Sequence, residues 1–203
     1  MRSAAALGIV SFFLLAAGAN AQFVPSGNIA LGYSYVRADL SAGRPLAGSF
    51  SNSNFNGWDG SLELKFIPWI GAVADFGGNY GTPRFTLSCV IPVISSPPCG
   101  PFDANTHVTT FLFGPRVSLS LSRFTPFAHV LLGAGHIGAS GMVPGGGNFS
   151  TTDTSFTTAV GAGLDYKLIK GLAWRFQGDD LHTRFFNSAQ NNFRLTTGIV
   201  VRF

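Results

Sequence analysis

The sequence predicts an all-β protein, an eight-stranded antiparallel up-and-down transmembrane β-barrel. Two observations support this prediction. Apolar and polar residues alternate along eight segments, and the connections between the segments are long and short in turn. Successive side chains of a strand point to opposite faces, so alternation gives each strand one apolar and one polar face. Strands can cross a membrane when a closed barrel satisfies all of their backbone hydrogen bonds.

The last predicted strand shows the alternation most clearly. Phe193, Leu195 and Ile199 fall on one face, and Asn192 and Arg194 fall on the other. Such a strand has one side in lipid or in an apolar core and the other side in a polar space. The eight predicted strands are residues 29–37, 58–66, 70–78, 109–121, 127–137, 156–167, 172–183 and 192–203.

The connections between these strands follow a rhythm. Short connectors are expected at 68–69, 122–125 and 168–170, and longer ones, rich in Gly, Ser, Asn or Pro, at 38–56, 80–106, 138–152 and 185–191. Every second connection of an up-and-down barrel emerges at the same rim, and outer-membrane barrels have short periplasmic turns and long outer loops. The rhythm therefore predicts a place in a bacterial outer membrane.

The N-terminal segment predicts export. Arg2 is followed by the apolar run 4–17 and by Ala19-Asn20-Ala21, which are the parts of a secretory signal peptide. We expect residues 1–21 to be this cleaved signal and residues 22–203 to form one barrel domain. A transmembrane anchor is the alternative, but the run is shorter than the ~20 residues that a helix needs to cross a bilayer.

The composition fits a membrane barrel better than a soluble one. Charged residues make up 11% of the chain, whereas soluble domains usually carry about a quarter. A soluble closed barrel such as a lipocalin remains an alternative, with its apolar face inside and residues such as Glu63 and Arg116 outside. The polar face mixes small residues such as Gly161 and Gly198 with long charged ones, and alternating small and large residues suit a narrow barrel interior.

An apolar face in lipid places the charged residues of the other face in the lumen. These residues are Glu63, Lys65, Asp75, Arg116, Asp165, Lys167, Arg175, Asp179, Arg194 and Arg202. Buried charges need partners because their hydration is lost. The predicted interior ion-pair network matches the carboxylates of Glu63, Asp75 and Asp179 with the guanidinium groups of Arg116, Arg175 and Arg194. The network is either purely structural or a plug whose pairs switch partners and pass small ions.

The two cysteines lie in the longest predicted loop, 80–106. The spacing of Cys89 and Cys99 fits no zinc or redox motif. In an exported protein we expect a disulfide between them. The loop then serves recognition, as exposed loops often do, or the bridge only protects it from proteolysis.

The sequence predicts no metal site, no cofactor and no catalytic site. Residues 133–138 fit a dinucleotide-binding glycine pattern, but the glycine-rich residues that follow cannot form the helix that this site needs. A lipid-modifying hydrolase would need a rim histidine, His107 or His182, beside a serine. The formal net charge of +4 comes from scattered Lys and Arg residues, so no nucleic-acid partner is expected.

Several short motifs resemble those of a known family. In their order along the chain, these motifs are similar to those of the OmpA-type small outer-membrane barrels, the "outer membrane protein beta-barrel domain" kind. They are residues 113–117, 126–130, 161–165 and 174–177 and the terminal Phe203. The resemblance covers about residues 27–203. It implies that Phe203 is part of the signal read by the outer-membrane insertion machinery.

These observations predict a non-enzymatic, monomeric, integral outer-membrane protein in contact with membrane lipid and lipopolysaccharide. Its expected role is structural, with narrow or no pore activity. A loop-mediated adhesin or ligand-binding surface protein is the first alternative, and a lipid-modifying hydrolase is the second.

Overall fold

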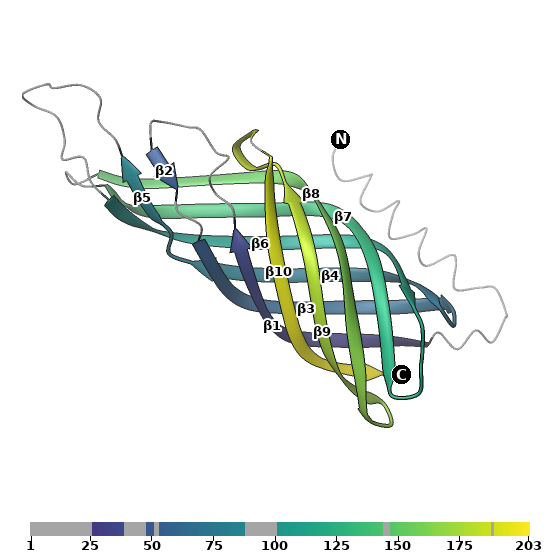
Figure 1. The fold of residues 1–203 in the computed structure, drawn as a ribbon. Helices are drawn as coiled ribbons and strands as arrows, with labels where there is room; N and C mark the ends of the chain where they lie inside the picture. Colours follow the sequence, from purple (N-terminus) through teal and green to yellow (C-terminus); the bar gives the residue numbers. More distant parts are fainter. Residues whose placement is uncertain (1–25, 39–47, 51–52, 88–100, 144–146, 188) are drawn as a thin grey trace, which may run out of the picture.

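The computed structural model describes residues 26–38, 48–50, 53–87, 101–143, 147–187 and 189–203. Eight long strands among them form a closed wall (Figure 1), and each pairs with its neighbours in antiparallel register. Around the ring they are β1 (Ser26–Ala38), β3 (Ser53–Ile67), β4 (Ile70–Gly81), β6 (Pro101–Ser118), β7 (Phe124–Val143), β8 (Gly147–Ile169), β9 (Leu172–Thr183) and β10 (Gln190–Arg202). The predicted eight-stranded up-and-down fold is confirmed.

The two faces of the wall sort as the alternation predicts. On β10, Arg194 and Thr196 are buried in the lumen, while Phe193 and Leu195 are exposed on the outside. The same holds on β6, where Arg116 is buried. The apolar face therefore points outward, and the arrangement of a soluble barrel with an apolar interior is wrong for this chain.

The ring is closed by β1 and β10, which pair along their whole length from the end that carries the short connectors and the C-terminus (Figure 1). The main chains of Gly27 and Phe203 exchange two hydrogen bonds of 3.0 Å, which join the first strand to the last. The β8–β9 turn contains Gly171 with a φ of 82°, a left-handed conformation that glycine adopts without steric cost. Several predicted boundaries are wrong. β6 ends at Ser118 and not at residue 121, and several strands begin earlier than predicted, among them β3 at Ser53, β6 at Pro101, β7 at Phe124 and β8 at Gly147.

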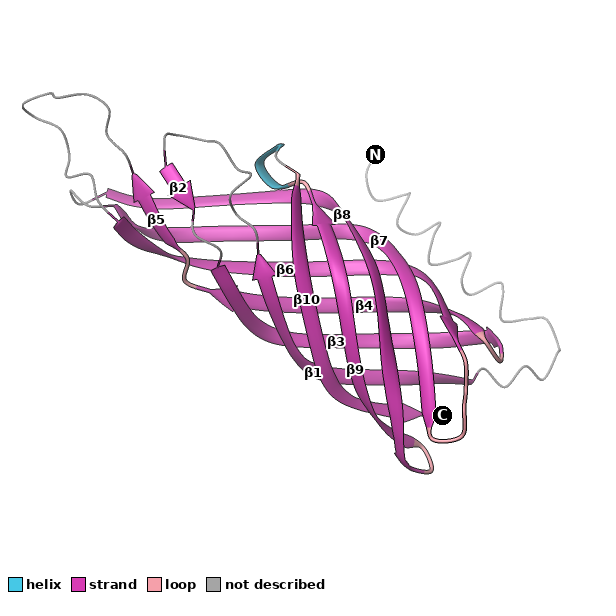
Figure 2. Ribbon diagram, in the orientation of Figure 1, coloured by secondary structure: helices cyan, strands magenta, loops and turns pink. Residues whose placement is uncertain are grey.

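The opposite end departs from the predicted loops. Residues 138–152 are mostly strand, because β7 and β8 stay paired as far as Val143 and Gly147. Val143, Phe149 and two threonines, Thr151 and Thr152, favour a strand there, although the glycines suggest a loop. Two short strands, β2 (Gly48–Phe50) and β5 (Arg84–Leu87), extend the sheet at this end, and the 3-10 helix η3 (Phe185–Asn187) joins β9 to β10 (Figure 2).

The lumen also contains an apolar layer. Val73, Leu112, Leu131, Ala159 and Leu181 form one buried cluster. Along β7 Leu131 lies on the loop side of His129, whereas along β4 Val73 lies on the turn side of Asp75, so the apolar layer lies beside the charged residues. Within the described ranges, no helix is long and apolar enough to span a membrane.

Candidate functional site: the charged lumen

Arg194 on β10 is the centre of the first charged layer. Its Nη1 lies 2.9 Å from Asp59 Oδ2 and 2.9 Å from Asp75 Oδ1, and its Nη2 lies 2.7 Å from Asp179 Oδ2. All four side chains are buried. One guanidinium therefore holds three carboxylates from three other strands, and this layer carries an excess of negative charge.

A second layer lies nearer the short-turn end. Arg116 Nη1 is 3.2 Å from Glu63 Oε2, and Arg175 donates to both oxygens of Asp165 at 2.8 and 3.0 Å. Asn28 joins the two pairs, since it donates to Glu63 at 2.7 Å and accepts from Arg175 at 3.3 Å. Each buried charge in this layer thus has a partner of opposite sign, as burial requires.

His129 connects the two layers. Its Nε2 lies 2.9 Å from Asp179 Oδ1 and its Nδ1 lies 3.5 Å from Arg116 Nη2. A guanidinium can only donate, so Nδ1 is the acceptor and the Nε2 proton points toward Asp179. Phe127 also lies between the charges, with the guanidinium carbons of Arg116 and Arg175 at 4.3 and 4.7 Å from its ring centroid, within the range of cation–π attraction.

Inward-facing glycines leave room for these large side chains. A Cβ on Gly161 would lie 1.9 Å from Asp179 Oδ1 and 2.8 Å from His129 Nε2. A Cβ on Gly77 would lie 2.7 Å from Thr110 Oγ1 and 3.4 Å from Arg194 Nη1. The small residues expected on the polar face therefore leave the space that the charged side chains of the network occupy.

All six residues named from the sequence as a network lie in the lumen and are buried. These are Glu63, Asp75, Arg116, Arg175, Asp179 and Arg194. The expected partners are only partly right, since Arg175 pairs with Asp165, which stands directly opposite it on β8.

Sequence reasoning missed three members of the network, which are Asn28, Asp59 and His129. Asp59 was detectable because it shares the lumen face of its strand with Glu63, four residues later. His129 gave no signal beyond its place in a strand. Lys167, expected to face inward, is exposed near the turn end of β8, where it still pairs with the buried Ala173 of β9.

The remaining predicted sites lie outside the described residues or at the two rims of the barrel. Cys89 and Cys99, and the signal peptide 1–21, lie outside the described residues. Phe203 ends the closing strand pair and is 58% exposed. At the opposite rim, His182 Nδ1 lies 2.6 Å from Asn191 Oδ1, and the ring of His107 lies 6.2 Å from that of His136.

Comparison with solved structures finds proteins whose fold is similar to that of this chain. No protein-family model matches the chain, and no curated protein sequence matches it. Among solved structures, Ail, the attachment invasion locus protein of Yersinia pestis in complex with the heparin analogue sucrose octasulfate, matches with a TM-score of 0.56 and 19% identity, over 87% of this chain and 98% of Ail.

Two further structures show the same likeness. Neisserial surface protein A matches with a TM-score of 0.57 and 13% identity, over 87% of this chain and 97% of that protein. The outer membrane protein OprG of Pseudomonas aeruginosa matches with a TM-score of 0.55 and 12% identity, over 88% and 96% of the two chains. The chain has the fold of small outer-membrane β-barrels, and the narrower OmpA-type resemblance stays a prediction.

Proposed function

We propose that this protein is an integral β-barrel of a bacterial outer membrane, in contact with lipid and lipopolysaccharide. The outer surface supports this, since large apolar side chains such as Leu31, Phe113 and Phe176 are 66%, 57% and 59% exposed on it. Soluble monomers rarely expose apolar surface on this scale. The short-turn end then faces the periplasm, and the terminal Phe203 is available to the insertion machinery.

The proposed role is structural, with a lumen that is closed or passes only a narrow current. The observation that carries this proposal is the filling of the lumen by the charged residues and by the apolar layer beside them. Arg116, Arg194, Leu112 and Leu131 are all completely buried inside the wall. An eight-stranded barrel has an interior just wide enough for side chains to fill, so the charged and apolar layers leave little path for ions.

A conductance measurement in planar bilayers tests the closed lumen. The wild type should give little or no current, and Arg116→Ala and Glu63→Ala, which remove the two halves of one buried pair, should raise it. Val130→Ala, on the outer surface of β7, is the matched control and should leave the current unchanged. A large, steady wild-type current would contradict the proposal, and unchanged current in both lumen variants would rule out a plug that passes ions.

Location and oligomeric state need separate tests. We infer a monomer without enzymatic activity. Heat-modifiable gel mobility of the protein extracted from outer membranes would test barrel and location together, because a folded barrel migrates differently from the unfolded chain. Recovery of the protein only in the soluble fraction would contradict the membrane assignment.

Surface recognition is the second candidate function. It is supported by the sheet that continues beyond the ring, in which β5 pairs with β6 and Arg84 Nε lies 3.2 Å from Asp103 Oδ1. The similar structure of Ail was solved with a heparin analogue. Binding of heparin or host-surface ligands that is lost on deletion of residues 88–100 would favour this function, and binding that survives the deletion would argue against recognition there.

A lipid-modifying hydrolase remains the third candidate. Within the described part of the chain, neither His107 nor His182 forms a hydrogen bond with a serine, and His182 bonds instead to Asn191. Release of acyl chains from lipid A or phospholipid by the purified barrel would restore this candidate.

A further inference from the structure

Two histidines lie close together on the outward face of the wall, near the rim opposite the short connectors, the loop-side rim. His107 of β6 and His136 of β7 are on paired strands, and their ring centroids are 6.2 Å apart. Toward this rim the outward residues of β6 change from Phe113 and Phe111 to Thr109 and His107, all of them exposed. The pair therefore lies at the edge of the apolar band, where water can reach it.

The surface of β7 leaves room for the His107 ring. Gly138 stands directly opposite His107 in the β6–β7 register. A Cβ on Gly138 would lie 2.4 Å from His107 Cε1 and 2.7 Å from His107 Nε2, which is closer than two such atoms can approach. The His107 ring therefore fills the space over Gly138 and lies against the strand that carries His136.

The second imidazole is oriented by a hydroxyl group. His136 Nδ1 lies 2.8 Å from Oγ1 of Thr154, which stands directly opposite it on β8. When Nδ1 carries the ring proton and donates it to this hydroxyl, His136 Nε2 keeps its lone pair. Among the described residues, no hydrogen bond occupies His136 Nε2 or either ring nitrogen of His107. Metal-binding histidines are commonly held in this way, through the ring nitrogen that does not bind the metal.

The spacing of the two rings suits a shared metal ion. Imidazole nitrogens bind zinc at about 2.0–2.1 Å, so two imidazoles on one ion have ring centres roughly 5–6.5 Å apart. The observed 6.2 Å lies in this range. In the part of the chain that the structure describes, no third His, Cys, Asp or Glu completes a metal cluster, so water molecules would fill the other positions. Imidazole ligands favour zinc, copper or nickel, whereas magnesium and calcium prefer oxygen ligands.

We propose that His107 and His136 chelate a late first-row divalent cation, Zn²⁺ or Cu²⁺, at the loop-side rim. Each histidine supplies one neutral ring nitrogen, and Thr154 orients His136. The two histidines have no metal-ligand spacing in the sequence, and the pairing of β6 with β7 brings them together. The inference goes beyond the proposed structural role and needs only the folded barrel, so it holds whether or not the lumen conducts.

Calorimetric titration with Zn²⁺ tests the site, in detergent micelles and without an added histidine tag. His107→Gln and His136→Gln should each weaken Zn²⁺ binding about tenfold or more, because one ligand of a chelate presents the ion to the other at high effective concentration. Thr154→Val should also weaken binding, since it removes the group that orients His136. With Cu²⁺, electron paramagnetic resonance should show two nitrogen ligands in the wild type and fewer in either histidine variant.

His182→Gln is the matched control. His182 is an exposed histidine of β9 at the same rim, and its Nδ1 lies 2.6 Å from Asn191 Oδ1. This variant should keep the Zn²⁺ affinity within about twofold of the wild type, because separate sites without shared partners act independently. Heat-modifiable mobility shows that each variant is folded. Equal loss in the His107 and His182 variants, no Zn²⁺ binding by the wild type, or displacement of bound Zn²⁺ by equimolar Mg²⁺ would overturn the site. Unchanged affinity of Thr154→Val would overturn the role of Thr154.

Discussion

The inner and outer faces of the barrel wall are built from alternate residues of the same strands, yet they meet different neighbours. Inward side chains such as Arg194 and Leu131 are completely buried among fixed partners. Outward side chains such as Leu195 and Leu132 are 47% and 50% exposed and would meet fluid lipid. A lumen residue therefore has to match its surroundings in charge and shape, whereas an outward residue has only to be apolar.

The largest expected effect on stability follows from the loss of Arg194. Arg194→Leu leaves Asp59, Asp75 and Asp179 without their shared cation. Removing one partner of a buried ion pair costs about 3–5 kcal/mol. Urea unfolding in lipid vesicles should show this loss, whereas the outward Leu195→Ala should change stability far less. Equal stability of Arg194→Leu and the wild type would show that the network contributes little to the fold.

Two adjacent leucines of β7 point to opposite faces of the wall, so substituting each of them compares the two faces directly. Leu131→Ala opens a cavity in the apolar layer and should cost about 2–5 kcal/mol, the transfer term plus the cavity term. Leu132→Ala leaves no cavity, because lipid fills the space, and should cost only the transfer term of about 1–2 kcal/mol. Unfolding free energies measured in the same vesicles would test this, and equal costs would mean that the lumen repacks freely.

A charge on the outer face tests the lipid contact. Val160 is 58% exposed near the middle of the outward span of β8, and Val160→Lys should cost about 2–4 kcal/mol, as a lysine does at the bilayer midplane. Leu168→Lys, at the end of the same strand, should cost about 0–1 kcal/mol near the interface. Stability in vesicles should follow this order, and tolerance of Val160→Lys would be incompatible with a lipid-facing wall.

The smallest expected effect concerns glycine. Gly161→Ala would place a methyl group 1.9 Å from Asp179 Oδ1, and overpacking of this kind costs about 1–3 kcal/mol. Gly178→Ala on the outer face of β9 meets no atom closer than 3.7 Å and should be nearly neutral. Thermal loss of the folded band on gels would measure both, and similar behaviour of the two variants would show that the lumen yields to accommodate the added methyl group.

The sequence by itself determined the strands and their faces. Alternation with period two assigned residues such as Glu63, Arg116 and Arg194 to one face, because side-chain direction along a strand depends only on local geometry. The short connectors were predictable because they interrupt this alternation. The strand content of 138–152 was not predictable, because its glycines are typical of loops and are depleted in strands.

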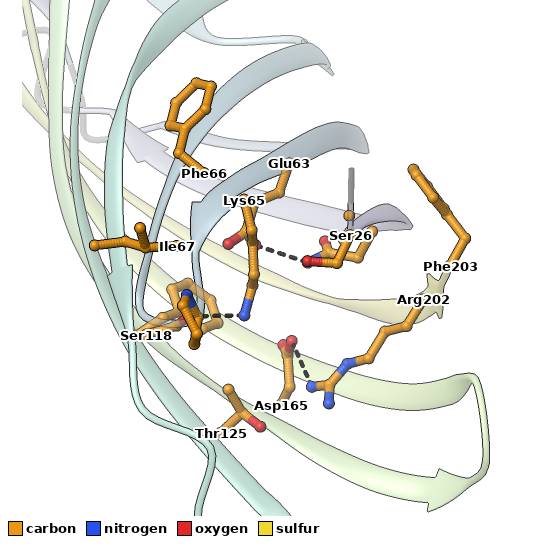
Figure 3. Close-up of a pocket in the computed structure, with 14 residues that line it drawn as sticks. Ser26, Glu63, Lys65, Phe66, Ile67, Ser118, Thr125, Asp165, Arg202 and Phe203 are labelled. Atoms are coloured by element: carbon orange, nitrogen blue, oxygen red, sulfur yellow. Dashed lines mark hydrogen bonds and ion pairs between the residues drawn. The ribbon is translucent and has the colours of Figure 1, made fainter. Parts of the chain in front are cut away.

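Only the tertiary structure decided which charges meet. Arg194 and Asp75 are 119 residues apart and Arg175 and Asn28 are 147 apart, so their contacts depend on ring closure and on the register of every intervening strand pair. The same closure brings Lys65 of β3 and Arg202 of β10 to one opening of the lumen at the short-turn end (Figure 3). A strand pattern specifies the face of each residue, but its depth in the lumen and its partners across the lumen follow from the pairing of all eight strands.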